Sequence, residues 1–346
     1  MSTSNGCVLL TGINGFIAVH ITKILLAKGY SVVGTIRSPS KADYIKTLFK
    51  NESEAGKLDF AVVDDITKDG AFDEVLKSKP FVAVLHTSSP FSLKVENPER
   101  DLLIPAIKGT KGILSSIHKH APSVKRVVVI SSFASCVNGS MGNWPEHVYT
   151  EKDWNPITYE KGTENGGAGY YASKKLAEES AWDFMKEFKP KFSLTTLCPP
   201  MVFGPPEQEV TSLANLNTSA AGMYDVFTGK EQPRNSVYIW VDVRDIALAH
   251  VLAIESDAAA NQRYLITAGS YSAQQFVDYI WKHYPERAQE KGVAKGTPGK
   301  LYPDGGVYTA DNSKSLRDLS GLEYHSFDDM CHATFERFLV LEKEGK

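Results

Sequence analysis

The sequence has few cysteines, no long apolar run and no excess of charge of either sign. Its four cysteines lie far apart, without a Cys-x-x-Cys pair, which argues against a disulfide scaffold and against a zinc site. Lys and Arg number 38 against 41 Asp and Glu, a formal net charge of −3, so no basic excess exists to hold a nucleic-acid backbone. We therefore expect no metal, no nucleic-acid partner and a reducing, cytoplasmic location.

A membrane segment is not expected either. The first apolar run, residues 7–10, is interrupted by Thr11 and Gly12, and no basic region precedes a long apolar stretch. This pattern predicts neither a secretory signal nor a transmembrane helix. What the chain does have is 346 residues, 42% of them hydrophobic and 23% charged. That composition is typical of a globular protein with a large core.

Short β-branched runs alternate with stretches of helical period over the first 130 residues. We expect strands at residues 7–11, 31–37, 58–63, 81–87 and 125–132. Several of them are apolar throughout, as strands buried on both faces are. The alternation predicts an α/β fold: a doubly wound parallel sheet of the Rossmann type, with helices on both faces.

The second half of the chain departs from this alternation. A strand beginning at residue 193 reaches the Pro199-Pro200 step, where the chain must leave the sheet because proline does not fit a sheet interior. Residues 236–255 indicate a strand and a helix returning to the sheet, and a final amphipathic helix is expected near 326–343. We expect one domain from residues 1–204 with 236–256, and a smaller substrate lobe from 205–235 and 257–346.

A glycine-rich turn follows the first predicted strand and opens a predicted helix. Gly12 allows a tight turn, Gly15 lets the backbone approach a pyrophosphate, and Ala18 permits close packing of helix on strand. The helix N-terminus then offers free N–H groups to phosphates. This context favours a dinucleotide site over a turn of purely structural role. The expected loop contacts are Gly12, Asn14, Gly15, Phe16 and Ile17.

The end of the second strand indicates which dinucleotide binds. An acid there would accept from a ribose 2′-hydroxyl, whereas a cation would meet a 2′-phosphate. No acid occurs from Ser31 to Lys41, but Arg37 and Lys41 do, and arginine can form a fork with a phosphate. The pattern favours NADPH over NADH; the alternative is that both are solvated surface cations.

Polar residues after the third and fourth strands are further candidates. Asp65 could accept from the adenine amino group, and Thr87 and Ser88 could lie along the nicotinamide ribose. Asp65 is equally plausible as a helix N-cap, and Ser88 as a turn residue. The residues alone leave both alternatives open.

Two tyrosine–lysine pairs at i, i+4 spacing occur together in the chain: Tyr170 with Lys174, and Tyr171 with Lys175. Hydride transfer to a carbonyl leaves an alkoxide that needs a proton donor. A nearby ammonium lowers the pKa of a tyrosine by favouring the phenolate. Spacing alone does not choose between the two pairs, and an exposed, snorkelling helix face is the alternative to both.

The segment from Tyr170 to Lys174 resembles the active-site helix of the short-chain dehydrogenase/reductase superfamily, which often reads Tyr-x-Ala-Ser-Lys. The resemblance implies that Tyr170 is the proton donor and that Lys174 lowers its pKa and orients the nicotinamide ribose. It also implies a hydroxyl at the end of the fifth strand that holds the substrate oxygen. In the extended branch this is the second of a pair, which assigns Ser132, with Ser131 as the alternative.

Four further segments, residues 86–91, 101–106, 202–205 and 241–247, extend the resemblance over nearly the whole chain. They are similar to the dihydroflavonol-reductase-like group, and within it to fungal NADPH-dependent methylglyoxal, aldehyde and ketone reductases. The resemblance implies an adenosine site at Arg37, Lys41, Asp65 and Ile66. It further implies cofactor contacts along the rest of the cleft, at Thr87, Ser88, Pro199, Val202 and Ser219.

The resulting hypothesis is an NADPH-dependent carbonyl reductase, monomeric or homodimeric, acting on small or medium aldehydes and ketones. Its rivals are a nucleotide-sugar epimerase or dehydratase of the same superfamily and a non-catalytic NADP-sensing protein. Cys198 stands where the family pattern has Asn, a departure beside the pocket that affects substrate preference. The expected pocket wall, for which core packing is the alternative, is Phe91, Phe133, Val137, Met201 and Tyr224.

Overall fold

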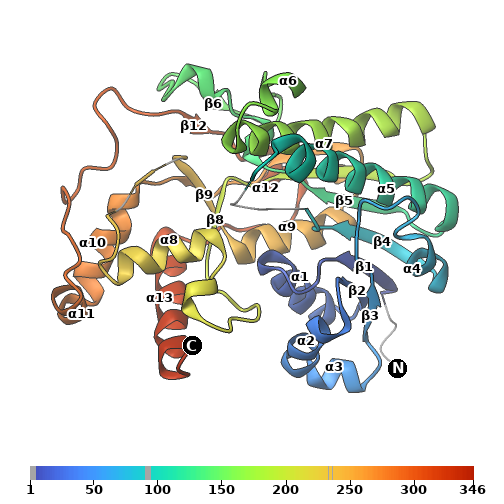
Figure 1. The fold of residues 1–346 in the computed structure, drawn as a ribbon, viewed down its shortest axis with the longest axis horizontal. Coiled ribbons are helices and arrows are strands. Elements are labelled where there is room, and N and C mark those ends of the chain that lie inside the picture. The colour runs from blue at the N-terminus through green and yellow to red at the C-terminus, as the bar shows by residue number, and fades with distance from the viewer. Residues whose placement is uncertain (1–4, 90–94, 233, 236) are drawn as a thin grey trace.

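The computed structural model describes residues 5–89, 95–232, 234–235 and 237–346. Seven parallel strands form the main sheet, in the order β10-β7-β5-β4-β1-β2-β3. Figure 1 labels β5, β4, β1, β2 and β3 of this sheet. The predicted doubly wound sheet is thus confirmed, and its winding reverses between β1 and β4. The strands are β1 (Cys7–Thr11), β2 (Ser31–Ile36), β3 (Leu58–Val62), β4 (Phe81–His86), β5 (Arg126–Ile130), β7 (Ser193–Cys198) and β10 (Gln262–Leu265).

Helices cover both faces of the sheet. One face packs against α1 (Phe16–Ala27), α2 (Asp43–Leu48) and α9 (Val243–Glu255). The other packs against α4 (Asp73–Ser78), α5 (Ile104–His120) and α7 (Gly166–Phe188). In β1, Val8 and Leu10 belong to the first core and Leu9 to the second. Alternate side chains point to opposite faces of a strand, so burial on both faces explains the continuous apolar runs.

The chain leaves the main sheet at Pro199, as the proline step predicts. After β7, the short strand β8 (Met201–Phe203) joins a second sheet with β9 (Ile239–Asp242) and β11 (Gly269–Ser270). Around this sheet, four helices enclose a separate apolar core. They are α8 (Thr218–Phe227), α10 (Ala273–His283), α11 (Pro285–Glu290) and α13 (Phe327–Lys343). The final helix was expected at 326–343 and begins one residue later.

Two expected boundaries are wrong. Within residues 236–256, the strand β9 joins the second sheet with β8 and β11, and it is α9 that returns to the main sheet. Residues 257–346 are expected in the substrate lobe, but β10 pairs with β7 at the edge of the main sheet. Tyr264 and Leu319 are buried in the core between that sheet and α1. The stretch returns to the sheet because its apolar residues are buried there.

The remaining elements are α3 (Lys50–Glu54), α6 (Tyr159–Gly162), α12 (Ser313–Asp318), the paired strands β6 (Val148–Tyr149) and β12 (Thr309–Ala310), and short turns of helix, η1 (Pro39–Ala42), η2 (Glu99–Leu103), η3 (Phe133–Ser135), η4 (Gly139–Met141), η5 (Leu213–Asn215) and η6 (Asp257–Ala259).

Across the described ranges, none of the helices combines the length and the apolar composition needed to cross a lipid bilayer.

Candidate active site

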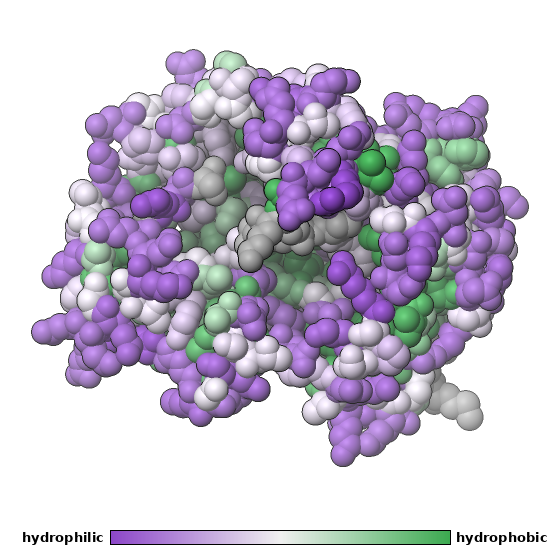
Figure 2. All heavy atoms as spheres, in the orientation of Figure 1, coloured by the Kyte–Doolittle hydropathy of each residue, from purple (hydrophilic) through white to green (hydrophobic). Residues whose placement is uncertain are grey.

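A groove runs along the carboxyl ends of the strands, at the point where the winding of the sheet reverses. It consists of two cavities of about 560 and 540 Å³ that share Gly12, Gly15, Thr87 and Ser89 in their walls. Hydrophobic residues lie on the floor of a hollow near the middle of the face in Figure 2. Open α/β sheets bind their ligands at such a switch point, so this groove is the candidate site.

The glycine-rich loop lines both cavities. Gly12 has a φ of +67°, which favours glycine, and a Cβ there would lie 2.7 Å from the Ser88 hydroxyl oxygen. Helix α1 begins at Phe16 behind Gly15, which offers no capping side chain. The first N–H groups of the helix are therefore left for a ligand, as a dinucleotide phosphate requires.

The end of β4 is fastened to this loop through Thr11. The Thr11 hydroxyl oxygen accepts from the backbone N–H groups of Thr87 and Ser88, each at 3.0 Å. Its own hydrogen is then left for Nδ1 of His86, also 3.0 Å away. Burial, helped by the charge of Lys174, lowers the pKa of His86 to about 4, so the ring is a neutral acceptor. The loop after β4 therefore takes a fixed position across the groove.

The second cavity is positively charged at its outer end. Arg37 and Lys41, both exposed, line it together with Ile66 and Asn14. Lys41 also reaches across to Glu209, with Nζ 3.5 Å from Oε2. Two cations at the end of β2 fit the 2′-phosphate of NADPH better than a ribose hydroxyl.

Asp65 takes the role of a turn residue. Its Oδ1 accepts from both the backbone N–H and the hydroxyl of Thr67, at 2.8 and 2.7 Å. These hydrogen bonds lower the pKa of Asp65. The helix N-cap that the sequence leaves as an alternative is not observed, because the next helix, α4, begins only at Asp73. The neighbouring Ile66 lines the cavity.

Helix α7 directs only one of its two tyrosine–lysine pairs into the groove. Tyr170 and Lys174 line the first cavity. Tyr171 packs instead against an aromatic cluster beside η3, and Nζ of Lys175 pairs with Glu179 at 2.8 Å. The register that spacing leaves open is therefore decided in favour of Tyr170 and Lys174.

The two serines after β5 have different partners. Ser132 forms a hydrogen bond with the side chain of Tyr170, and its Oγ also accepts from the backbone N–H of Ala134 at 3.1 Å. The Ser131 hydroxyl donates instead to the buried carboxylate of Glu178 at 2.6 Å. Both line the cavity, but Ser132 is the one that shares a hydrogen bond with the tyrosine.

The expectation that Lys174 lowers the pKa of Tyr170 is wrong for this structure. Burial raises the pKa of Tyr170, and the hydrogen bond from Ser132 only partly opposes it. Nζ of Lys174 lies 5.9 Å from the centre of the tyrosine ring and donates to the Ser89 hydroxyl at 2.9 Å. Burial also lowers the pKa of Lys174 to about 8. Loss of water is thus the main cause of both shifts: it raises the pKa of the tyrosine and lowers that of the lysine.

Of the expected pocket wall, Met201 lines the cleft together with three expected cofactor contacts, Pro199, Val202 and Ser219. Three other assignments are corrected. Phe133 and Val137 are buried in the core cluster beside η3, where the ring of Phe133 meets Tyr149. Tyr224 points to α13 and donates to Glu342 at 2.9 Å. Phe91 lies outside the described residues.

Several residues of the groove are not among the expected contacts. Ser89, the partner of Lys174, lines both cavities, and Thr218 lines the first. Ser89 directly follows the predicted contacts Thr87 and Ser88, which is a usable signal. Glu178 lies one turn beyond Lys174 on α7, and this i, i+4 spacing could have placed it on the same helix face. Its partner Arg263 has none, because an arginine in a strand does not predict burial.

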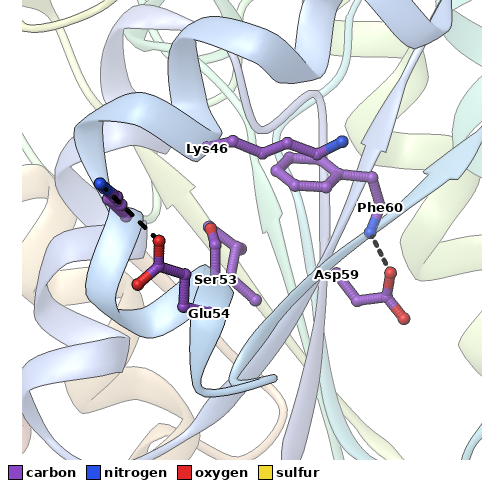
Figure 3. Close-up of a pocket in the computed structure, with 7 residues that line it drawn as sticks. Lys46, Ser53, Glu54, Asp59 and Phe60 are labelled. Atoms are coloured by element: carbon purple, nitrogen blue, oxygen red, sulfur yellow. Dashed lines mark hydrogen bonds and ion pairs between the residues drawn. The ribbon is translucent and has the colours of Figure 1, made fainter.

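A separate open pocket of about 480 Å³ lies at the far edge of the sheet, between α3 and β3 (Figure 3). Its two lysines have partners within the lining: Lys50 pairs with Glu54 at 3.8 Å, and Nζ of Lys46 lies 5.5 Å from the centre of the Phe60 ring. Its lining contains neither the glycine loop nor the tyrosine–lysine pair. Among the described residues, the glycine loop and the tyrosine–lysine pair therefore lie in the groove and not in this pocket.

The groove, with its glycine loop, its cationic end and its paired tyrosine and lysine, is that of a dinucleotide-dependent enzyme. The chain belongs to the NAD dependent epimerase/dehydratase family, whose model matches residues 8–267. This confirms the resemblance to the extended short-chain dehydrogenases/reductases.

Individual relatives are similar over almost the whole chain. The identity is 35% over 342 residues with NADPH-dependent methylglyoxal reductase GRE2 of Saccharomyces cerevisiae, covering 97% of this chain and 98% of that protein. It is 41% over 320 residues with ketoreductase azaE of Aspergillus niger, covering 90% and 91%. The solved structure of yeast methylglyoxal/isovaleraldehyde reductase Gre2 complexed with NADPH superposes with a TM-score of 0.87, at 35% identity, covering 97% of this chain and 99% of that one.

Proposed function

We propose that the protein is an NADPH-dependent carbonyl reductase that converts small or medium aldehydes and ketones to alcohols. The observation that carries the proposal is the convergence of Tyr170, Ser132 and Lys174 on the cavity that begins at the glycine loop. Relatives named as NADPH-dependent and ketone reductases, similar from end to end, support the same activity.

The groove fits NADPH along its length. Gly12 and Gly15 with the start of α1 would hold the phosphates, Arg37 and Lys41 the 2′-phosphate, and Lys174 the nicotinamide ribose. Because Gly12 has no Cβ, the loop can lie close to Ser88 without a clash. When bound, NADPH supplies the hydride.

The chain's own residues supply the proton and hold the substrate oxygen. The raised pKa of Tyr170 keeps its hydroxyl protonated near neutral pH, which is the form a proton donor needs. Ser132 donates a hydrogen bond to the oxygen as negative charge develops there. The Lys174 ammonium, still largely protonated at pH 7, would hold the nicotinamide ribose and so position the cofactor beside Tyr170.

The proposal includes a cytoplasmic location and a monomeric or homodimeric state. Four free cysteines, three of them buried, are consistent with a reducing compartment. The rival epimerase reaction would need the same tyrosine and lysine, but Arg37 and Lys41 favour NADPH, which a reductase takes up and releases in each turnover.

Tyr170→Phe removes the proton donor and leaves the ring in place. We expect kcat for aldehyde reduction to fall by about 10²- to 10⁴-fold, the usual contribution of a general acid, while the NADPH dissociation constant stays within about twofold. Steady-state NADPH oxidation and fluorescence titration measure the two quantities.

The neighbouring Tyr171→Phe is the matched control, because it removes the same hydroxyl from a side chain outside the cavity. It should keep the parental kcat. Equal activity of Tyr170→Phe and the parent would remove Tyr170 from the reaction.

Arg37→Ala tests the cofactor end of the groove. We expect KM for NADPH to rise by about tenfold or more, since a charge-assisted hydrogen bond contributes roughly 1.5–3 kcal/mol, while KM for NADH changes little. Lys57→Ala, an exposed cation away from the groove, should change neither value. A parallel rise for both cofactors would show that Arg37 does not contact the 2′-phosphate.

A further inference from the structure

A side pocket of about 140 Å³ opens between α8 and α10, beside the active-site cleft. Its wall includes Met201, Thr218 and Ser219, which also line the cleft, so the two spaces meet across one shared wall. One side of the rest of its lining is buried and mostly apolar: Phe203, Met223, Val226, Tyr271, Ala273 and Phe276. The exposed residues Glu231, Gln232 and Arg234 form its polar side.

One face of α8 leads from the cleft into this pocket. Ser219, Gly222, Met223 and Val226 all line it, and their spacing of three, four and seven residues places them on a single helix face. The helix therefore presents a polar residue to the cofactor groove and, one turn further on, a smooth apolar surface to the side pocket.

Gly222 is an unusual residue at this place. Glycine in a helix interior is less favourable than alanine, so packing would have to require it. Yet among the described residues no atom lies within 4 Å of the position that a Cβ would take there. The protein's own packing therefore does not demand glycine. Gly222 is exposed, and the open space beside it belongs to the mouth of the pocket that it lines.

We propose that the side pocket is a substrate subsite for a phenyl-sized apolar group, kept open by Gly222. This inference depends on the proposed reductase function and specifies its substrates: aldehydes and ketones that carry one aromatic ring, or a branched group of equal size, on a short linker. An engineered apolar cavity of about 150 Å³ binds benzene, so a pocket of about 140 Å³ accommodates one ring.

The two sites would act together on one substrate. The carbonyl oxygen stays at Tyr170 and Ser132, while the linker passes Met201 and the ring packs against the apolar side of the pocket. Burial of apolar surface then favours the longer substrate over a small aldehyde with the same reacting group.

The test compares propanal with 3-phenylpropanal, which differ only by the ring. We expect the parent to have the higher kcat/KM for 3-phenylpropanal, and Gly222→Leu to lower the ratio of the two values by about tenfold or more, because even one misfitting methylene in an apolar pocket costs about 10- to 200-fold. Gly222→Ala, which adds one methyl group, should give an intermediate ratio.

Lys282→Leu, at an exposed position of α10, is the matched control and should keep the parental ratio. Thermal unfolding of each variant monitors the fold. The subsite is overturned if Gly222→Leu keeps the parental ratio of the two kcat/KM values. It is also overturned if Lys282→Leu lowers that ratio as much as Gly222→Leu does.

If the parent reduces neither aldehyde, the reductase function itself fails. The subsite is then decided by the binding of 3-phenylpropan-1-ol, measured by ligand-observed NMR. Binding to the parent that Gly222→Leu abolishes supports the subsite, and equal binding to both proteins overturns it.

Discussion

The lysine of the active-site helix lies in surroundings that change its chemistry. Lys174 donates to Ser89 and lies beside the neutral ring of His86, and burial lowers its pKa to about 8. An ordinary lysine loses its proton near 10.4. Lys174 therefore loses its charge within the pH range in which enzymes are commonly assayed.

This shift predicts the pH dependence of the reaction. Because the ammonium is lost as pH rises through about 8, kcat/KM for NADPH, which reports the free enzyme, should fall above that pH. Lys174→Arg, whose guanidinium does not deprotonate, should move this fall to higher pH. Lys175→Arg is the control and should leave the fall near pH 8, and an unchanged fall in Lys174→Arg would assign it to another group.

At the scale of elements, α7 is the helix that connects the chemistry to the sheet. Its residues Tyr170, Lys174 and Glu178 follow one another at four-residue intervals. The Glu178 carboxylate, 1% exposed, accepts from Ser131 and from Thr196 of β7, at 2.6 and 2.7 Å. It also pairs with Arg263 of the edge strand β10 at 2.8 Å. One carboxylate thus links the helix to three strands or strand ends.

Glu178→Gln should destabilise the fold strongly. Breaking a buried ion pair by removal of one partner costs about 3–5 kcal/mol, and urea denaturation measures that loss. Glu164→Gln makes the same chemical change in an exposed pair with Lys161 and should cost less than about 1 kcal/mol. If the two variants lose equal amounts of unfolding free energy, the buried pair contributes no more to stability than the exposed pair does.

The same substitution carries a pH signature. Burial alone would raise the pKa of Glu178, but the charge of Arg263 and the hydrogen bonds from Arg263, Ser131 and Thr196 outweigh it and lower the pKa. Its stabilising contribution is therefore present above the ordinary value of 4.5 and is lost as pH falls through the native value. The difference in the free energy of unfolding between the parent and Glu178→Gln should therefore become smaller as the pH is lowered.

Over the whole molecule, the sequence predicts those features that local pattern determines. The strands of the main sheet other than β10 are predictable because burial makes them apolar, and the exit at Pro199 because proline does not fit the sheet. The glycine loop and the hydroxyl pair after β5 are predictable because their chemistry lies within a few consecutive residues.

Features set by contacts between distant segments could not be predicted. Tyr224 faces Glu342, 118 residues later, and nothing near it in sequence indicates that partner. Strand β10 begins with Gln262 and Arg263, which read as surface residues until Glu178 supplies a buried partner. The raised pKa of Tyr170 likewise follows from the depth of the groove, which only the folded chain defines.

The path of the chain between its two sheets has a consequence for engineering. Because β8 and α8 leave the main sheet, α9 and β10 return to it, and α10 and α13 leave it again, no single cut separates a complete nucleotide-binding half from the remainder. A chimera that borrows the specificity of another reductase must therefore exchange at least two stretches at once, joined at both ends of the α9–β10 segment. Exchange of only one would leave the second apolar core composed of mismatched halves.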